Sequence, residues 1–502
     1  MQVLQDGKRI QKIVDTVNGD SQRFFDIVSF DPRGVGNTLP RMQCFPDSLT
    51  DYVWNQQLLT EGIVTSSRQA YDNLWARSKA LSAACAKDDS GIASFMDTWS
   101  VANDMRAIAR QLHGTEDNAH LQYWGFSYGT IIGSAFATHF PDEVDRMVLD
   151  GVVYGPAWHA GENAQFLRDA DEVFERFFDY CLATDCEFAA GLEKLNDSLY
   201  CQSMGFLDRI KRFFEKCLDT GCSFDSPGHS DSEYLGYRLH DLLHRLRQDP
   251  LPVAGPNGPA TVTYADVKRL ISQSVYAPRD MFPILATILA DLNKGNGSSL
   301  VEFQTAVLQE TRPARCLMPE CRADAVCTET CRMIDDYRSE VTSAVMCLDI
   351  NRNHGLTGIS KEEFRQQHVQ PIMSASMWVG DTMTGIEVLL PCLHRDMPPV
   401  LPFDGPIGGK TATPILLIGN TLDPATPLAS AHQTSQLFEG SVVLEQKSEG
   451  HCSYTAPSNC TEKHVRAYFN RGVLPKKGAK CEVDEELFPR SNKWLFGKKK
   501  EL

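Results

Sequence analysis

Residues 125–129 read Gly-Phe-Ser-Tyr-Gly, which matches the pattern Gly-x-Ser-x-Gly. This pattern holds a nucleophilic serine on a strained turn between a strand and a helix, and the glycines let the two backbones approach closely. An apolar run over residues 120–124 predicts a buried strand before the turn, and residues 130–137 predict a buried helix after it. The bare pattern occurs by chance, but in this setting it predicts that Ser127 is a nucleophile.

A nucleophilic serine needs a base, and the base needs an acid that orients it. Residues 413–420 predict a buried strand, and Asp423 follows them in a loop. A second predicted strand, residues 441–445, is followed by His451. Both side chains therefore come after the carboxyl end of a strand, which is the edge of an open α/β sheet where ligands bind. The chain order serine, aspartate, histidine predicts a catalytic triad.

Other residues compete for these roles. Asp150 also follows a predicted strand and is an alternative acid, although its Leu-Asp-Gly context favours a turn residue. His432, His464 and His394 are rivals to His451, but none of them has a loop position after a predicted strand.

These segments and several others resemble the tripeptidyl aminopeptidase-like (TAP-like) family of secreted serine peptidases, relatives of prolyl aminopeptidase among the α/β-hydrolases. The resemblance runs from about residue 25 to residue 481 and is weakest in the middle third. It implies that Ser127, Asp423 and His451 form the triad and that the backbone N–H of Tyr128 is one oxyanion donor. The matching segments are residues 25–36, 125–130, 146–152, 414–427, 450–452 and 468–475, followed by Cys481.

The resemblance further implies an exopeptidase that cleaves peptide bonds near a free amino terminus through an acyl-enzyme. Peptides are then the expected partners, and the mechanism needs no cofactor and no metal. Two alternatives stay open. The same triad hydrolyses carboxylic esters, and a hydrolase fold can also be catalytically impaired.

One departure from the family concerns the amino terminus. Family members carry a Gly-rich turn before the helix that precedes the strand at residues 26–31, whereas residues 2–17 here already predict that helix. The strand before this turn would lie between the strands at residues 26–31 and 121–124. The turn also supplies the second oxyanion N–H, whose loss typically lowers turnover about 10²–10³-fold. We therefore predict an amino-terminally truncated peptidase without these strands, and its activity stays an open question.

The order of strand and helix signals predicts an α/β-hydrolase fold with an insertion. Residues 1–155 and 401–485 alternate strands and helices and should form the two parts of the core. Residues 156–400 are mostly helical and Cys-rich, and we expect a lid inserted between strands 6 and 7 of the fold. Residues 249–259 predict a loop within this lid, and residues 486–502 predict a basic tail.

The composition favours a secreted enzyme. The 502 residues carry a net charge of −16, which argues against a nucleic-acid partner. The 16 cysteines favour disulfides and an oxidising compartment. No stretch is long enough to span a membrane, and residues 1–17 lack the apolar core of a signal peptide, which the predicted truncation would explain. We expect the full-length form to be extracellular. The glycosylation sequons are at Asn196, Asn296 and Asn459.

The cysteines allow several pairings. Residues 177–186 and 213–222 are similar to each other, and each predicts a short local bridge, Cys181 to Cys186 and Cys217 to Cys222. Zinc is disfavoured against disulfides, because the cysteines of residues 316–331 lack a C-x₂-C pair. The pairs suggested by the family resemblance are Cys44 with Cys85, Cys347 with Cys392, and Cys460 with Cys481.

Overall fold

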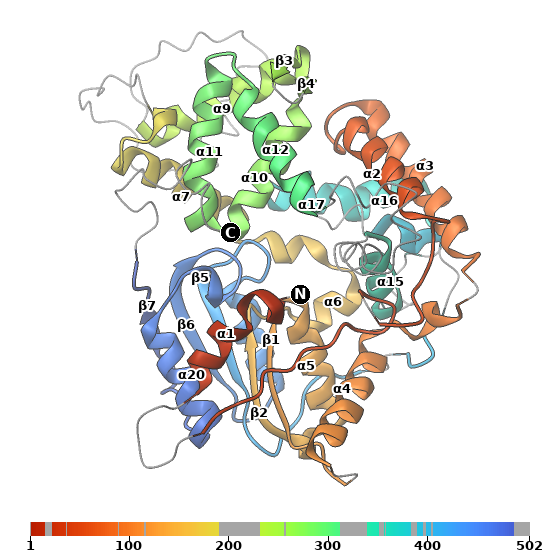
Figure 1. Ribbon diagram of the computed structural model, residues 1–502, viewed down its shortest axis with the longest axis vertical. Coiled ribbons are helices and arrows are strands. Elements are labelled where there is room, and N and C mark those ends of the chain that lie inside the picture. The colour runs from red at the N-terminus through yellow and green to blue at the C-terminus, as the bar shows by residue number, and fades with distance from the viewer. Residues whose placement is uncertain are drawn as a thin grey trace.

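A five-stranded sheet forms the centre of the lower half of the computed structural model (Figure 1). The strand order is β1-β2-β5-β6-β7, and every neighbouring pair is parallel. Parallel neighbours need crossover connections, which accounts for the alternation of strand and helix signals along the sequence. The strands are β1 (Leu121–Phe126), β2 (Val144–Asp150), β5 (Leu416–Leu422), β6 (Val442–Glu449) and β7 (Lys480–Glu482).

Several segments fall outside the part of the chain that the structure describes. They include Asn196, the second Cys-containing repeat and the basic tail. The described residues are 2–15, 23–36, 38–88, 90–114, 117–189, 231–255, 258–311, 339–350, 356, 358–382, 389–394, 398–402 and 405–485.

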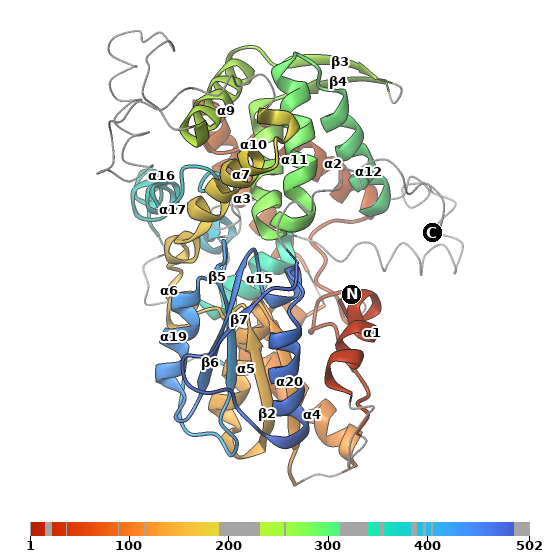
Figure 2. The same ribbon diagram turned by 90° about the vertical axis from the view of Figure 1, so that its left-hand side faces the viewer.

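Helices cover both faces of the sheet, because successive side chains of a strand point to opposite faces. Met147 and Leu149 of β2 pack in one buried cluster with α4, α5 and α19, whereas Val148 packs in another with α1 and α20. Figure 2 shows α5 and α19 on one side of the strands and α20 and α1 on the other. These helices are α1 (Gln2–Val14), α4 (Thr98–His113), α5 (Tyr128–His139), α19 (Leu428–Leu437) and α20 (Asn459–Arg471).

A helical layer lies above the sheet (Figures 1 and 2). Most of it comes from the chain between β2 and β5, but two helices that precede the sheet in sequence join it. Tyr71 and Leu74 belong to the buried cluster of this layer, and the Tyr71 hydroxyl donates to the carbonyl of Lys361 at 2.8 Å. Its helices are α2 (Ser48–Glu61), α3 (Arg68–Cys85), α6 (Gly155–Ala160), α7 (Ala170–Ala183), α9 (Asp231–Gln248), α10 (Tyr264–Tyr276), α11 (Pro278–Asn293), α12 (Ser298–Thr311), α15 (Ser339–Asp349), α16 (Lys361–Phe364) and α17 (Gln370–Ala375).

Short helical turns complete the described elements. They are η1 (Ile92–Phe95), η2 (Pro141–Glu143), η3 (Asn163–Leu167), η4 (Glu187–Ala189), η7 (Arg365–Val369), η8 (Leu390–His394) and η9 (Ser453–Thr455). The division into core, lid and tail stays a prediction.

Residues 26–31, which the sequence predicts to be a strand, form neither strand nor helix. Phe25 and Ile27 pack on the cluster beside α20, and Phe30 packs on the cluster beside α5. A strand needs a neighbour for its backbone N–H and C=O groups. Among the described strands, β1 is at one edge of the sheet and does not pair with this segment. The apolar side chains of the segment are therefore partly buried, but its backbone does not join the sheet.

The Pro- and Gly-rich residues 249–259 were expected to be a loop, but most of them belong to an antiparallel hairpin of β3 (Leu251–Gly255) and β4 (Gly258–Val262). Val253 and Val262 are buried, whereas Pro252 is exposed. The residues therefore alternate between buried and exposed, as in a half-buried strand. The prolines argued against a strand because proline is uncommon inside strands.

Four disulfides lie within the described residues, and all four pairs were anticipated from the sequence. They join Cys44 to Cys85, Cys181 to Cys186, Cys347 to Cys392, and Cys460 to Cys481. The predicted Cys217–Cys222 bridge and the cysteines of residues 316–331 lie outside the part that the structure describes.

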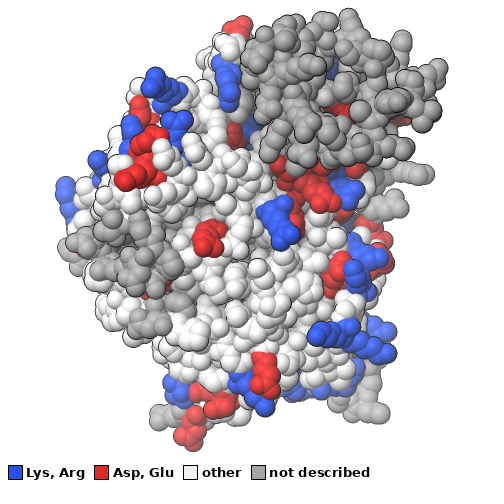
Figure 3. All heavy atoms as spheres, turned by 180° about the vertical axis from the view of Figure 1, so that it is seen from behind, with Lys and Arg blue, Asp and Glu red and all other residues white. Residues whose placement is uncertain are grey.

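The described helices include none that is both long and apolar enough to cross a bilayer. On the face shown in Figure 3, lysine and arginine side chains are interspersed with aspartate and glutamate. The described residues visible on this face therefore form no extended patch of one sign.

Candidate active site

Ser127 lies on the turn between β1 and α5 with φ 53° and ψ −123°. A positive φ is strained for a residue with a side chain, and such strain is typical of functional sites. The Ser127 N–H donates to the Asp150 carbonyl at 3.0 Å, and the Ser127 carbonyl accepts the N–H and the hydroxyl of Thr130. The backbone of the serine is therefore fixed on both sides of its strained conformation.

The glycines of this turn are required by close packing. A Cβ on Gly125 would lie 2.6 Å from the carbonyl oxygen of Gly129, and a Cβ on Gly129 would lie 3.1 Å from the Tyr123 hydroxyl. The first distance is a clash with backbone, which cannot move without displacing the turn that carries Ser127.

We expect Gly125→Ala to destabilise the protein by about 1–3 kcal/mol, because its new methyl group would overpack the turn. It should also slow the reaction of Ser127 with a fluorophosphonate. Gly255→Ala is a matched control, since a Cβ there meets nothing within 4 Å. Thermal unfolding and labelling rates measure both variants. Equal behaviour of the two variants would contradict the proposed packing of the turn.

Asp423 and His451 are in direct contact. The Nδ1 atom of His451 lies 3.0 Å from Oδ1 of Asp423, and both side chains are buried. Asp423 follows β5 and His451 follows β6, neighbouring parallel strands whose carboxyl ends meet at one edge of the sheet. Nδ1–H donating to a carboxylate is the arrangement that leaves Nε2 able to accept a proton.

The environment of Asp423 favours its ionised form. Burial opposes ionisation, but His451 and the N–H groups of Cys452 and Ala425 outweigh that effect, so the pKa of Asp423 is lowered. The N–H groups of Ala425 and Thr426 donate to Oδ1 at 2.9 and 2.8 Å, and the N–H of Cys452 donates to Oδ2 at 2.9 Å. A charged acid with this many donors can orient the imidazole.

Ser127 approaches the histidine loop through Cys452. The backbone of Ser127 lies close enough to the thiol of Cys452, the residue after His451, to act on the pKa of that thiol. Burial, Asp150 and Asp423 raise the pKa of the Cys452 thiol well above its ordinary value. The thiol is therefore neutral and unsuited to act as a competing nucleophile.

Two polar residues that the sequence reasoning missed hold this loop. Thr426 donates its hydroxyl to Oδ2 of Asp423 at 2.8 Å and lies 3.2 Å from Nδ1 of His451. Asn420, at the end of β5, donates its side-chain amide to the carbonyls of Gly450 and Cys452, both at 2.8 Å. The loop is thus anchored before and after the histidine.

The helical layer also contacts the histidine. The N–H of His451 donates to the carbonyl of Tyr276 at 2.8 Å, and the two rings meet edge to face with centroids 5.2 Å apart. A Cβ on Gly450 would lie 2.6 Å from Pro278, so only glycine fits there. The base is therefore positioned from two directions, the sheet and the end of α10.

Tyr128 is the first residue of α5, so its N–H is one of the first-turn groups that lack an acceptor within the helix. Its hydroxyl is 2.8 Å from Oγ1 of Thr98. Thr98 donates its N–H and hydroxyl to Asp349, which also accepts Nε1–H of Trp158 at 2.8 Å. The tyrosine is thereby held, through Thr98, by a buried carboxylate that no sequence pattern indicates.

Asp349 should make stability depend on pH. Burial raises its pKa to about 7 despite the hydrogen bonds from Thr98. The folded state thus holds the carboxyl proton of Asp349 more tightly than the unfolded state does. The stabilisation that this proton provides is complete below about pH 4 and is lost as the pH rises to about 7. Relative to wild type, Asp349→Asn should gain unfolding free energy over this range, at most on the order of 4 kcal/mol. Chemical denaturation at several pH values between 4 and 7 measures this difference. A difference in unfolding free energy between variant and wild type that does not change with pH would contradict the prediction.

The rival residues have other surroundings. The carboxylate of Asp150 binds the N–H and hydroxyl of Ser453. His432 lies in α19, His464 lies in α20, and the ring of His394 packs edge-on against Trp75. Within the described residues, the histidine that hydrogen-bonds to Asp423 is His451 and none of these three.

Two sequons can be placed on the structure. Asn296 is exposed after α11, and its side chain accepts the N–H of Ser298 at 3.0 Å. Asn459 is exposed at the first residue of α20. Both are at the surface, as a glycan requires, and glycosylation stays a prediction.

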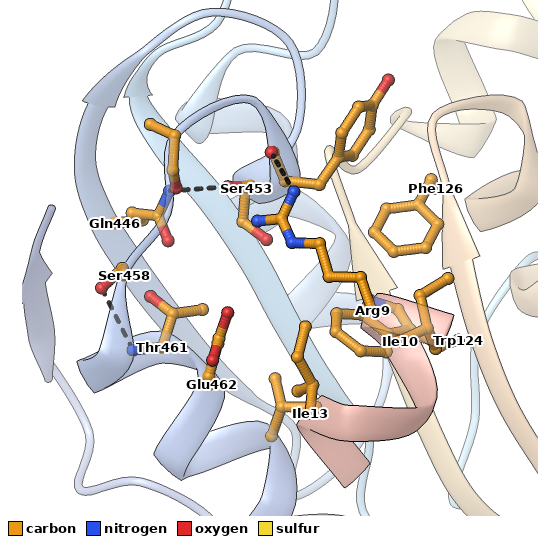
Figure 4. Close-up of a pocket in the computed structure, with 13 residues that line it drawn as sticks. Arg9, Ile10, Ile13, Trp124, Phe126, Gln446, Ser453, Ser458, Thr461 and Glu462 are labelled. Atoms are coloured by element: carbon orange, nitrogen blue, oxygen red, sulfur yellow. Dashed lines mark hydrogen bonds between the residues drawn. The ribbon is translucent and has the colours of Figure 1, made fainter. Parts of the chain in front are cut away.

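A small cavity lies on the α1 side of the histidine loop (Figure 4). Ile10 and Ile13 of α1, Trp124 and Ser453 line it, and Arg9 donates to the carbonyl of Tyr454 at 3.2 Å. Its volume of about 30 Å³ has room for about two water molecules and is far too small for a peptide.

Comparisons with known proteins agree with this arrangement. Residues 379–481 match the family described as TAP-like protein, and residues 13–190 match the family described as alpha/beta hydrolase fold. The first range contains Asp423 and His451, and the second contains Ser127.

Three relatives are similar over most of the chain. Serine protease Hip1 of Mycobacterium tuberculosis is 24% identical over 462 residues, which cover 91% of this chain and 74% of the relative. Tripeptidyl aminopeptidase of Streptomyces lividans is 22% identical over 472 residues, 92% of this chain and 71% of the relative. Carboxylesterase B of Mycobacterium tuberculosis is 24% identical over 476 residues, which cover 93% of this chain and 75% of the relative. The resemblance inferred from the motifs is confirmed: the chain is a serine hydrolase that is similar to the TAP-like family of α/β-hydrolase serine peptidases.

Proposed function

We propose that this protein is a serine exopeptidase that releases short peptides from a free amino terminus, with Ser127 as nucleophile, His451 as base and Asp423 as the orienting acid. The observation that carries the proposal is the buried contact between His451 and Asp423, in a loop that also touches the backbone of Ser127. The names of two relatives, a serine protease and a tripeptidyl aminopeptidase, support the peptide substrate class.

The reaction begins when Nε2 of His451 takes the hydroxyl proton of Ser127 and Oγ attacks the scissile carbonyl. The Tyr128 N–H donates to the oxyanion that develops on the carbonyl oxygen. The tetrahedral intermediate collapses, the C–N bond breaks, and His451 returns the proton to the leaving amine. Water then attacks the acyl-enzyme with His451 again as base, which frees the acid product and restores Ser127.

The neighbouring groups support this cycle by restricting the imidazole. Asp423 stabilises the imidazolium that forms after proton transfer and keeps Nδ1 protonated before it. Thr426 donates to the same carboxylate, and Tyr276 holds the backbone of His451. The imidazole is therefore oriented before the reaction begins, which lowers the entropy cost of reaching the transition state.

A second candidate is a carboxylester hydrolase. One relative is named carboxylesterase B, and ester cleavage uses the same nucleophile, base and oxyanion donor. Only the leaving group differs, an alcohol in place of an amine.

A substrate panel separates the two candidates. Peptide amides with a free amino terminus, the same peptides with an acetylated amino terminus, and short-chain aryl esters are compared by kcat/KM. An exopeptidase should cleave the free-amine peptides and lose most activity on acetylated ones. Cleavage of esters alone would favour the esterase, and equal cleavage of free and acetylated peptides would contradict amino-terminal recognition.

We further propose that the enzyme works in an oxidising, extracellular compartment. The four disulfides of the described residues support this, because such bonds persist where thiols are not kept reduced.

A further inference from the structure

Asp150, the last residue of β2, contacts both the serine turn and the histidine loop. Its backbone carbonyl accepts the N–H of Ser127 at 3.0 Å. Its side chain is fully buried and accepts the N–H of Ser453 at 2.8 Å and the Ser453 hydroxyl. Ser453 is two residues after His451, so a single residue bridges the two segments that must meet for proton transfer.

Both bridged segments are strained. Ser127 has φ 53° and Cys452 has φ 64°, and these are two of only four residues other than glycine with positive φ in the described chain. Each such residue costs about 1–3 kcal/mol and persists only where its surroundings hold it. The N–H of Ser127 itself, and the N–H of the residue after Cys452, both donate to Asp150.

Two carboxylates hold consecutive N–H groups of the histidine loop. Asp423 accepts the N–H of Cys452, and Asp150 accepts the N–H of Ser453. Asp423 also contacts the imidazole, whereas the carboxylate of Asp150 accepts hydrogen bonds from Ser453 and from Nε1–H of Trp124, the latter at 3.4 Å. The two acids therefore have different partners, and Asp150 acts on the loop and not on the ring.

The path between β2 and the loop has no spare room. A Cβ on Gly151 would overlap the sulfur of Cys452, and it would lie 3.1 Å from the hydroxyl of Thr426. Ser453 and Trp124 also line the small cavity on the other side (Figure 4). Space is therefore available on the cavity side, whereas a shift from β2 toward the histidine loop meets Cys452 directly.

Keeping a carboxylate at this position is costly. Burial raises the pKa of Asp150 to about 6, and the two donors of Ser453 and the indole of Trp124 oppose that rise. An ionisable group held in a desolvated site beside catalytic residues is more common where it serves function than where it only fills a core.

We propose that Asp150 is a positioning residue that sets the distance between Ser127 and His451, holding the serine turn with its backbone carbonyl and the histidine loop with its carboxylate. This inference rests on the proposed function. Loss of the carboxylate frees Ser453, lets Cys452 relax from its positive φ and moves the imidazole away from the serine hydroxyl. We expect substrate binding to be unaffected, because the side chain of Asp150 is fully buried and is held by Ser453 and Trp124.

The test compares Asp150→Asn with wild type, Ser127→Ala and Asp171→Asn. Asp171 is a matched control, since this buried carboxylate accepts the N–H groups of Met377 and Trp378 and the hydroxyl of Ser376 within the helical layer. Reaction with an alkyl fluorophosphonate gives a maximal inactivation rate and an apparent affinity, and a free-amine peptide amide gives kcat and KM. Thermal unfolding is measured in parallel.

For Asp150→Asn we expect the maximal inactivation rate and kcat to fall about 10²-fold, with affinity and KM unchanged, because misplacement by about 1 Å has this effect. Asp171→Asn should lose comparable thermal stability and keep both rates. If Asp150→Asn does not fold, Ser453→Ala removes one of its hydrogen bonds and should lower the same rates about 10-fold.

Two results would overturn the inference: rates of the Asp150→Asn or Ser453→Ala protein equal to wild type, or an equal loss of rate in Asp171→Asn. A wild-type protein that reacts no faster than Ser127→Ala would instead overturn the proposed function, and this inference with it.

Discussion

Ser127→Ala is expected to lose hydrolysis of peptide amides and esters by a factor on the order of 10⁶, because removing the nucleophile of a serine triad has this effect. The loss should appear in kcat, with little change in KM, since a single hydroxyl contributes little to binding of the ground state. Covalent labelling by a fluorophosphonate should disappear entirely. The substitution removes one atom at a half-buried position, so the fold should remain intact.

Ser134→Ala provides the matched control for this result. Ser134 lies in α5, the helix that begins directly after Ser127. Its side chain is buried, and its hydroxyl has no hydrogen-bond partner among the described residues. Replacing an unpaired buried hydroxyl by hydrogen should be neutral or slightly stabilising. Unchanged turnover in Ser127→Ala would end the assignment of the nucleophile, whatever the control does.

Asp423→Asn is expected to lower kcat about 10⁴-fold at neutral pH, because the amide favours the wrong imidazole tautomer. The amide nitrogen would also face one of the donors that now bind the carboxylate, among them the hydroxyl of Thr426 and the N–H of Cys452. The free-amine peptide amide and fluorophosphonate labelling measure the effect. KM should change little.

The same experiment decides between the two acids. If Asp423→Asn kept most of its kcat while Asp150→Asn lost activity about 10⁴-fold, the orienting role would pass to Asp150, the rival named from the sequence. The contact of 3.0 Å between Asp423 and His451 argues for the opposite result.

The sequence predicted the parts of the site that depend on local pattern. Ser127, Asp423 and His451 are candidates because each follows an apolar strand at the carboxyl edge of a parallel sheet, and the alternation of strands and helices is visible in the sequence. The pairing of Asp423 with His451 follows from the adjacency of β5 and β6, since strands that are consecutive in the core are commonly neighbours.

The sequence could not predict the groups that hold the site from a distance. Tyr276 and Asp150 reach the histidine loop from segments more than a hundred residues away in the chain, and no periodic pattern marks such contacts. Thr426 was closer to detection. The loop Asp-Pro-Ala-Thr after β5 is typical of an aspartate that binds N–H groups two and three residues later, and that signal was available at Asp423.

The prediction of a strand at residues 26–31 is wrong for a related reason. Apolar alternation reports that side chains are buried, and Phe25, Ile27 and Phe30 do pack on the sheet. Pairing of the backbone depends on a neighbouring strand, which is a property of the whole sheet and not of the segment.

The hydrogen bond from His451 to the carbonyl of Tyr276 has a consequence for how this enzyme can be reshaped. A shortened protein that keeps the sheet but omits residues 156–400 would also discard the end of α10, on which the imidazole rests. The imidazole of His451 would then lose this support, even if Ser127 and Asp423 stayed in place. Exchange of the helical layer between relatives should therefore succeed only when the new segment also supplies an acceptor for the backbone N–H of His451.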